Sequence, residues 1–198
     1  IGTMGFMAEL ENTELAQLAR VATGDYTVDE RMMLDVTVHR DRDIIFHDIC
    51  LNDVVVTKGA VARIVHLNVR CDDIQAMECN GDGVIVATPT GSTAYNLSAG
   101  GPIVEPRARL IMMTPVCSHT LANNRTIILA ADDIIDIEIA EYKPGEKQEV
   151  SASFDGRHPV NLNEGDKIRI IRSDKVTKIL KLSKVSFLET LQKKMRIY

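Results

Sequence analysis

Residues 80–95 read Asn80-Gly81-Asp82-Gly83-Val84-Ile85-Val86-Ala87-Thr88-Pro89-Thr90-Gly91-Ser92-Thr93-Ala94-Tyr95 and combine a glycine turn, an apolar run and a small-residue loop. Asn80-Gly81 predicts a turn, because both residues tolerate positive φ. The run 84–87 is too short for a helix and predicts a buried strand. Pro89 ends regular structure, and Gly91 lets the backbone approach a neighbour closely. The pattern therefore predicts a strand that passes through a compact loop into a helix, as in a ligand cradle.

The helix expected after this loop is short and spans Thr93–Ala99. Ser92 is its predicted N-cap, and Gly100-Gly101-Pro102 supplies the C-cap and the stop. The open N-terminus of such a helix directs N–H donors and partial positive charge at a phosphate or carbonyl oxygen. Tyr95 and Ser98 are three residues apart and share a helix face, where a ring and a hydroxyl suit a nucleobase or a nicotinamide.

Two familiar phosphate-binding patterns do not occur in this stretch. A Walker A loop needs Gly-Lys-Ser/Thr, and no lysine follows Gly91. The Gly81-x-Gly83 pair lacks the third glycine of a dinucleotide fingerprint, because Val86 occupies that position. Asp82 is a candidate acceptor for an amide or amino N–H of a ligand. A plain strand-to-helix connection with a capped helix is the alternative to a binding site.

The residues of this region resemble the signature of the NAD kinase family. The similar segments are Asp82-Gly83, 88–95 and 98–103, and further ones follow in family order at 2–6, 51–53, 114–121, 124–125 and 153–156. The resemblance covers nearly the whole chain. It implies a mainly β fold: a two-layer, β-sandwich-like C-terminal domain of the NAD kinase type with a few short helices.

The resemblance also implies which residues bind NAD. Asn52 and Asp53 match an Asn-Glu pair of the family that reaches the adenosine part of NAD, and a carboxylate beside an amide suits ribose hydroxyls. Aspartate is one methylene shorter than the family's glutamate, so the backbone must lie closer. The further positions implied are Arg63, Asn80, Asp82, Thr93, Ala94, Tyr95, Asn96, Leu97, Ser98 and Arg157. Asn80 and Arg157 depart from the residues common in the family, which are Arg and Gln.

The Gly-Gly-Asp-Gly motif of the family does not occur in this sequence. In the family it lies on an N-terminal α/β domain, and its aspartate is the expected general base. We therefore expect residues 1–198 to form a single NAD-binding domain without a catalytic residue. Residues 1–25 are expected to form the helical segment that leaves the absent N-terminal domain.

The resemblance implies that the complete enzyme transfers a phosphoryl group from ATP or polyphosphate to the 2′-hydroxyl of the adenosine ribose of NAD, giving NADP. Mg²⁺ is expected with the donor, held largely by its phosphates. A homodimer or homotetramer is also implied. Two other classes stay open: a non-catalytic dinucleotide-binding or assembly module, and the β-rich half of a related lipid kinase.

Composition limits the remaining classes. A chain of 198 residues with 45% apolar content is long enough for one globular domain with its own core. A net charge of −5 gives no reason to expect nucleic acid or an anionic membrane as partner. No apolar run is long enough to span a bilayer. Cys50, Cys71, Cys79 and Cys117 have neither disulfide-motif nor zinc spacing, which predicts reduced thiols in a cytoplasmic protein and no metal site.

Short β-branched or alternating runs dominate the rest of the chain and predict a β-sandwich or folded-over sheet. The predicted strands are 33–38, 44–49, 54–57, 63–70, 84–87, 127–131, 134–140, 149–154, 167–172 and 176–182. Helical spacing predicts two further helices, at 13–22 and 186–195.

Overall fold

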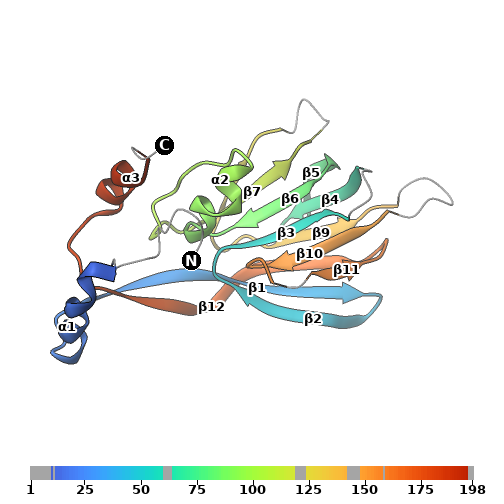
Figure 1. Ribbon diagram of the computed structural model, residues 1–198. Helices are drawn as coiled ribbons and strands as arrows, with labels where there is room; N and C mark the ends of the chain where they lie inside the picture. The colour runs from blue at the N-terminus through green and yellow to red at the C-terminus, as the bar shows by residue number, and fades with distance from the viewer. Residues whose placement is uncertain are drawn as a thin grey trace.

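The computed structural model describes residues 10, 12–59, 64–118, 124–141, 148–157 and 159–195. Two six-stranded antiparallel sheets account for most of them (Figure 1). The first sheet contains, in spatial order, β2 (Asp43–Cys50), β1 (Thr27–Arg40), β12 (Lys167–Lys181), β9 (Ile135–Ile139), β4 (Val65–Cys71) and β5 (Ile74–Gly81). The second contains β11 (Val160–Leu162), β10 (Val150–Phe154), β3 (Asp53–Lys58), β6 (Gly83–Ala87), β7 (Leu110–Val116) and β8 (Ile127–Ala130).

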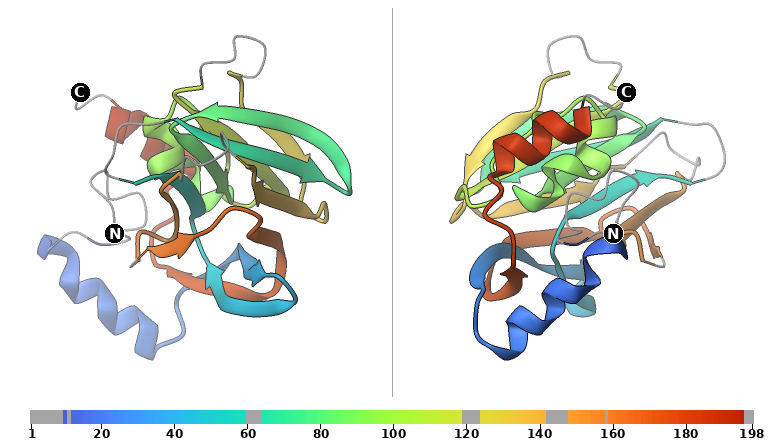
Figure 2. Two further views of the ribbon diagram at one scale, coloured as in Figure 1. Left: turned by 90° about the vertical axis from the view of Figure 1, so that its right-hand side faces the viewer. Right: turned by 60° about the vertical axis from the view of Figure 1, so that its left-hand side comes forward.

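Helical segments are few and short. They are η1 (Asn12–Leu18), α1 (Ala19–Ala22), η2 (Thr90–Thr93), α2 (Tyr95–Ser98) and α3 (Phe187–Met195). The α1 segment lies beyond the sheets, at the end of the long ribbon that β1 and β12 form (Figure 1). In both views of Figure 2, α3 lies on the same side of the sandwich as α2. Among the described residues, no helix has the length and apolar character needed to cross a membrane.

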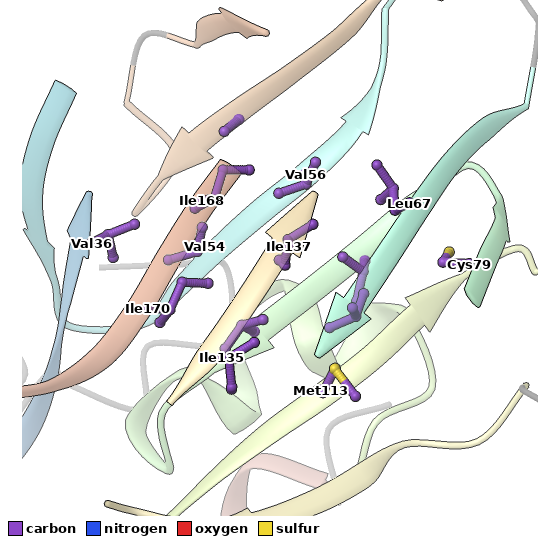
Figure 3. Close-up of a cluster of buried hydrophobic side chains, with 14 of the residues drawn as sticks. Val36, Val54, Val56, Leu67, Cys79, Met113, Ile135, Ile137, Ile168 and Ile170 are labelled. Atoms are coloured by element: carbon purple, nitrogen blue, oxygen red, sulfur yellow. The ribbon is translucent and has the colours of Figure 1, made fainter. Parts of the chain in front are cut away.

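The main core lies between the two sheets, because alternate side chains of each strand point to opposite faces. In β4, for example, Val65, Leu67 and Val69 are buried, whereas the residues between them are half-buried. Figure 3 shows apolar side chains from both sheets meeting in this layer. Phe46 of the first sheet and Phe154 of the second stack with ring centroids 4.6 Å apart. The two-layer, mainly β fold expected from the sequence is thus confirmed.

The strand β6 is buried along its whole length, and this explains its unbroken apolar sequence. One face contributes Val84 and Val86 to the main core. The other face contributes Ile85 and Ala87 to a second cluster, against which the half-buried Val104 packs. The outer face of β6 is therefore covered by the segment that follows it in the chain.

Several strand predictions need correction. The predicted strands 167–172 and 176–182 are one continuous strand, β12, while β5, β7 and β11 were missed. The predicted helix 13–22 is divided into η1 and α1. Asn80-Gly81 is not the turn but the end of β5, and the chain bends at Asp82 as it passes from the first sheet to the second. A side chain at 81 would lie 2.8 Å from the carbonyl oxygen of Cys117, so glycine serves close packing there.

Candidate functional site

Three loops meet at one end of the second sheet because of its antiparallel order. Asp53, the first residue of β3, pairs with Ala87, the last residue of β6, and the end of β10 pairs with β3 beside them. The segments 51–53, 88–94 and 155–157 therefore come together at this end, and we refer to them as the loop cluster.

The Asp155 carboxylate fixes the start of β3. It accepts hydrogen bonds from the backbone N–H groups of Leu51, Asn52 and Asp53, at 2.8, 2.7 and 3.2 Å. Asp155 has a φ of 49°, a left-handed conformation that aspartate tolerates better than most residues. The turn at Asp155-Gly156 thus connects the end of β10 to the backbone of the Asn52-Asp53 pair.

The loop after β6 is held against the same backbone. The Thr88 N–H donates to the Asn52 carbonyl oxygen at 2.9 Å, and the Thr88 hydroxyl donates to the Leu51 carbonyl oxygen at 2.6 Å. The Gly91 N–H in turn donates to the Thr88 hydroxyl at 3.1 Å. A side chain at 91 would place Cβ 2.1 Å from the Asn52 carbonyl oxygen. The close neighbour that the sequence predicted for Gly91 is therefore the Asn52 backbone.

The predicted capping role of Ser92 is wrong. Ser92 is buried, and its hydroxyl is hydrogen-bonded to the backbone of Val104, donating to O at 3.2 Å and accepting from N at 3.1 Å. The helix begins only at Tyr95, with Ala94 as N-cap and no side-chain cap. At four residues, α2 is also shorter than the predicted Thr93–Ala99 helix and sums too few peptide dipoles to hold an anion by itself.

Asn96 anchors α2 to the sheet. Its side chain is completely buried, with Oδ1 accepting from the Thr114 hydroxyl at 2.7 Å and Nδ2 donating to the Pro102 carbonyl oxygen at 3.3 Å. A side chain at Gly101 would lie 2.4 Å from this amide. Because Asn96 points inward, the neighbouring Tyr95 is left 45% exposed.

The other predicted residues of this helical turn differ in exposure. Ser98 is exposed, like Tyr95, whereas Thr93, Ala94 and Leu97 are half-buried. The Thr93 hydroxyl donates to the Thr90 carbonyl oxygen at 3.4 Å. The turn therefore presents a ring and a hydroxyl beside the loop cluster.

Asp53 is a buried carboxyl group beside a second acidic group. It is 5% exposed, and none of the described residues donates a hydrogen bond to its side chain. Burial, and secondarily the negative charge of Asp155, raises the pKa of Asp53 to about 6. Burying a polar group without a hydrogen bond is unfavourable, so a ligand hydroxyl that donates to this carboxylate would relieve the cost.

The structure separates two groups of predicted residues. Arg157 lies in the loop cluster, where its guanidinium donates to Asp48 at 2.6 Å. Asn80 and Asp82 lie at the opposite end of β6, which by its five residues is about 16 Å long. There Asp82 forms an ion pair with Lys58 at 2.8 Å. Arg63 lies outside the described residues.

A cavity of about 630 Å³ adjoins the loop cluster through Thr90 and Thr93. Its other walls come from the start of β1, the end of β12, residues 105–107 and α3 with the segment before it. Arg31 lines it, and sequence reasoning missed this residue; a charged residue just before the apolar Met32-Met33-Leu34 run was the available signal. Within the described part of the chain, no three His, Cys, Asp or Glu side chains are arranged to hold a metal ion.

The fold and the loop cluster define a β-sandwich domain with a polar candidate binding site at one end of a sheet. Residues 51–182 match the family model of the ATP-NAD kinase C-terminal domain. Over 98% of its length, the chain is 40% identical to the NAD kinase of Lachnospira eligens and 43% identical to that of Symbiobacterium thermophilum, covering 70% and 67% of those proteins. The chain belongs to the NAD kinase family and corresponds to its C-terminal domain, which confirms the resemblance.

Two solved structures share the fold. The yeast NADH kinase complexed with NADH matches 99% of this chain with a TM-score of 0.91 and 26% identity, over 58% of its own length. An NAD kinase from Archaeoglobus fulgidus in complex with ATP matches 94% of this chain, over 67% of its own length, with a TM-score of 0.71 and 22% identity. The chain thus spans between about three fifths and 70% of the length of these relatives.

Proposed function

We propose that residues 1–198 form the NAD-binding domain of an NAD kinase, an enzyme that phosphorylates the 2′-hydroxyl of the adenosine ribose of NAD to give NADP. The observation that carries the proposal is the buried Asp53 carboxylate, to which no described residue donates a hydrogen bond. Asp53 directly follows Asn52 in the chain, on a backbone that Asp155 holds in place. The two side chains together match a ribose diol, whose hydroxyls both donate and accept.

The neighbouring α2 turn supplies the second half of the recognition. The exposed Tyr95 ring offers a surface on which a base can stack, and the Ser98 hydroxyl offers a polar contact at the edge of that base. Both residues are on the same helical turn, which the buried Asn96 fixes to β7. The yeast relative complexed with NADH supports a dinucleotide of this kind as the ligand.

In the proposed reaction the chain binds and orients the acceptor ribose. Phosphoryl transfer depends mainly on positioning and on stabilising charge, and the loop cluster supplies the positioning. The phosphate donor is proposed to be ATP or polyphosphate. Mg²⁺ is proposed to accompany the donor, held largely by its phosphates. Homodimers or homotetramers and a cytoplasmic location belong to the same proposal.

Calorimetric titration of the chain with NAD tests this function. Tyr95→Ala removes the stacking surface and is expected to weaken binding about tenfold, because base–aromatic stacking contributes about 1–3 kcal/mol. Ile128→Ala on β8 is the matched control, since Ile128 is 49% exposed and Tyr95 45%. Equal affinity of the two variants for NAD would contradict the proposal that Tyr95 helps to bind NAD.

The same titration tests Asp82, which lies with Asn80 at the end of β6 opposite the loop cluster. Asp82→Ala breaks the ion pair with Lys58 and is expected to weaken NAD binding, because the proposed site includes Asp82. Binding of phospholipid vesicles without binding of NAD would instead favour the lipid kinase class.

A further inference from the structure

Arg31 connects the first sheet to the loop cluster. It lies on β1 and is 9% exposed. Its Nε and Nη2 atoms donate to Asp29 Oδ2 at 3.0 and 2.7 Å. Its remaining nitrogen, Nη1, donates to the Thr90 hydroxyl at 3.4 Å. Because Thr90 is the first residue of η2, this contact joins β1 of the first sheet to the loop that follows β6, across 59 positions of sequence.

The buried Arg31–Asp29 pair fixes the position of the Arg31 guanidinium. The side chains are only 11% and 12% exposed, and Asp29 Oδ1 is buried with no hydrogen-bond partner in the described part of the chain. Desolvation offsets much of the attraction within such a buried pair, so it contributes little net stability. The rigid guanidinium, held on one edge by Asp29, is instead well suited to fix whatever its other edge contacts.

The cavity beside this pair is also lined by Lys181 and Lys184, but its arginines are already engaged by acidic side chains. Two further arginines line it, Arg20 and Arg107, and they pair with Asp25 and Glu105 at 2.7 and 2.8 Å. Their positive charge is thus already compensated, as that of Arg31 is by Asp29. A role for Arg31 in holding the loop therefore agrees better with the contacts than direct phosphate binding.

We propose that Arg31 is a positioning residue for dinucleotide binding: held by Asp29, it fixes Thr90 and thereby the loop that carries Thr93 and Tyr95. The effect on NAD binding rests on the proposed function, whereas the role of Arg31 in holding the loop does not depend on any ligand. The Thr90 carbonyl oxygen accepts from the Thr93 hydroxyl, and the Gly91 carbonyl oxygen accepts from the Ala94 N–H at 2.9 Å. A displaced Thr90 would thus move the residues that precede Tyr95.

Two substitutions address the contact from both sides. Thr90→Val keeps the side-chain shape, removes the hydroxyl and leaves the Arg31–Asp29 pair intact. Arg31→Lys keeps the charge but not the fork that reaches both partners. Each is expected to weaken NAD binding about tenfold in calorimetry, and the double variant is expected to be no weaker than Arg31→Lys, because both remove one interaction.

Arg169→Lys is the matched control. Arg169 also makes a two-point contact with an aspartate, Asp136, at 2.8 Å for both bonds, but the pair lies exposed on the first sheet. Its replacement is expected to leave NAD affinity unchanged. Weaker binding by this control to the same degree would assign the effect to the general loss of an ion pair and would overturn the proposal.

Hydrogen exchange of the ligand-free chain separates the inference from the proposed function. Thr90→Val is expected to accelerate exchange of the Ser92 and Ala94 amides, whose hydrogen bonds hold the loop. If exchange accelerates but the wild-type chain does not bind NAD, the positioning role stands and the proposed function fails. If the wild-type chain binds NAD, unchanged exchange in Thr90→Val overturns the positioning role, whether or not its affinity changes.

Discussion

Asp155 Oδ1 lies 2.7 Å from the backbone nitrogen of Asn52, although 103 positions separate the two residues in the chain. The contact exists because β10 ends where β3 begins in the antiparallel second sheet. One acidic turn thereby satisfies three neighbouring backbone N–H groups and holds the Asn52-Asp53 pair in position. The candidate site therefore depends on a residue that contributes mainly by accepting backbone hydrogen bonds.

Replacing Asp155 tests this dependence. Asp155→Ala leaves three amides without their acceptor and is expected to lower the free energy of unfolding by about 2–3 kcal/mol, since hydrogen bonds to a charged group contribute about 1.5–3 kcal/mol each and are not additive. Asp155→Asn keeps one acceptor oxygen and should lose less. Urea denaturation measures both, and an alanine variant as stable as the wild type would contradict the role given to Asp155.

Asp53 predicts a pH dependence of stability. Its pKa is raised from 3.8 to about 6, so the folded state binds this proton more tightly than the unfolded state does. The stability that this group contributes is therefore greatest below the unfolded pKa and falls as pH rises to about 6, by about 3 kcal/mol in total.

Asp53→Asn should remove this part of the stability profile. Urea denaturation from about pH 4 to about pH 7 is expected to show a smaller decline for the variant than for the wild type. Asp174→Asn, which replaces an exposed carboxyl group on β12, is the control and should follow the wild type. Parallel profiles for Asp53→Asn and the wild type would show that Asp53 titrates normally.

Gly91→Ala tests the contact between the loop and β3. The added Cβ would lie 2.1 Å from the Asn52 carbonyl oxygen, and neither backbone segment is free to move without breaking the Thr88 hydrogen bonds. We expect a loss of more than about 2 kcal/mol in unfolding free energy together with loss of NAD binding. Gly165→Ala, with a φ of 83° and open space around the position, should lose only about 1–2 kcal/mol. Equal losses would mean that the close approach is unimportant.

The sequence predicts well those strands in which burial determines the pattern of apolar and polar residues. β6 is buried on both faces, which explains its unbroken apolar run. β4 is buried on one face only, which explains its alternating sequence. β7 was missed because Met112-Met113-Thr114-Pro115 is not a β-branched run. Pro115 is tolerated there because the pairing of β7 with β8 extends only to Met113.

The parts of the site that escaped prediction depend on contacts between distant segments. The Ser92 hydroxyl binds Val104 rather than its own helix, and no local pattern indicates this choice. The Arg31–Thr90 contact joins two layers whose relative placement the sequence does not encode at short range. By contrast, Asn52 and Asp53 were predicted through the family resemblance, and the structure shows what holds their backbone in place: Asp155 accepts hydrogen bonds from both N–H groups.

NAD binding as a function of pH is the most direct measurement of the central claim, that Asp53 accepts a hydrogen bond from the bound dinucleotide. Calorimetric titration should show that the wild-type chain binds NAD and that its affinity increases as pH rises through about 6, where Asp53 ionises. Asp53→Asn should bind about tenfold or more weakly above that pH and show little pH dependence. A wild-type chain that does not bind NAD, or an Asp53→Asn variant with wild-type affinity at every pH, would contradict the account.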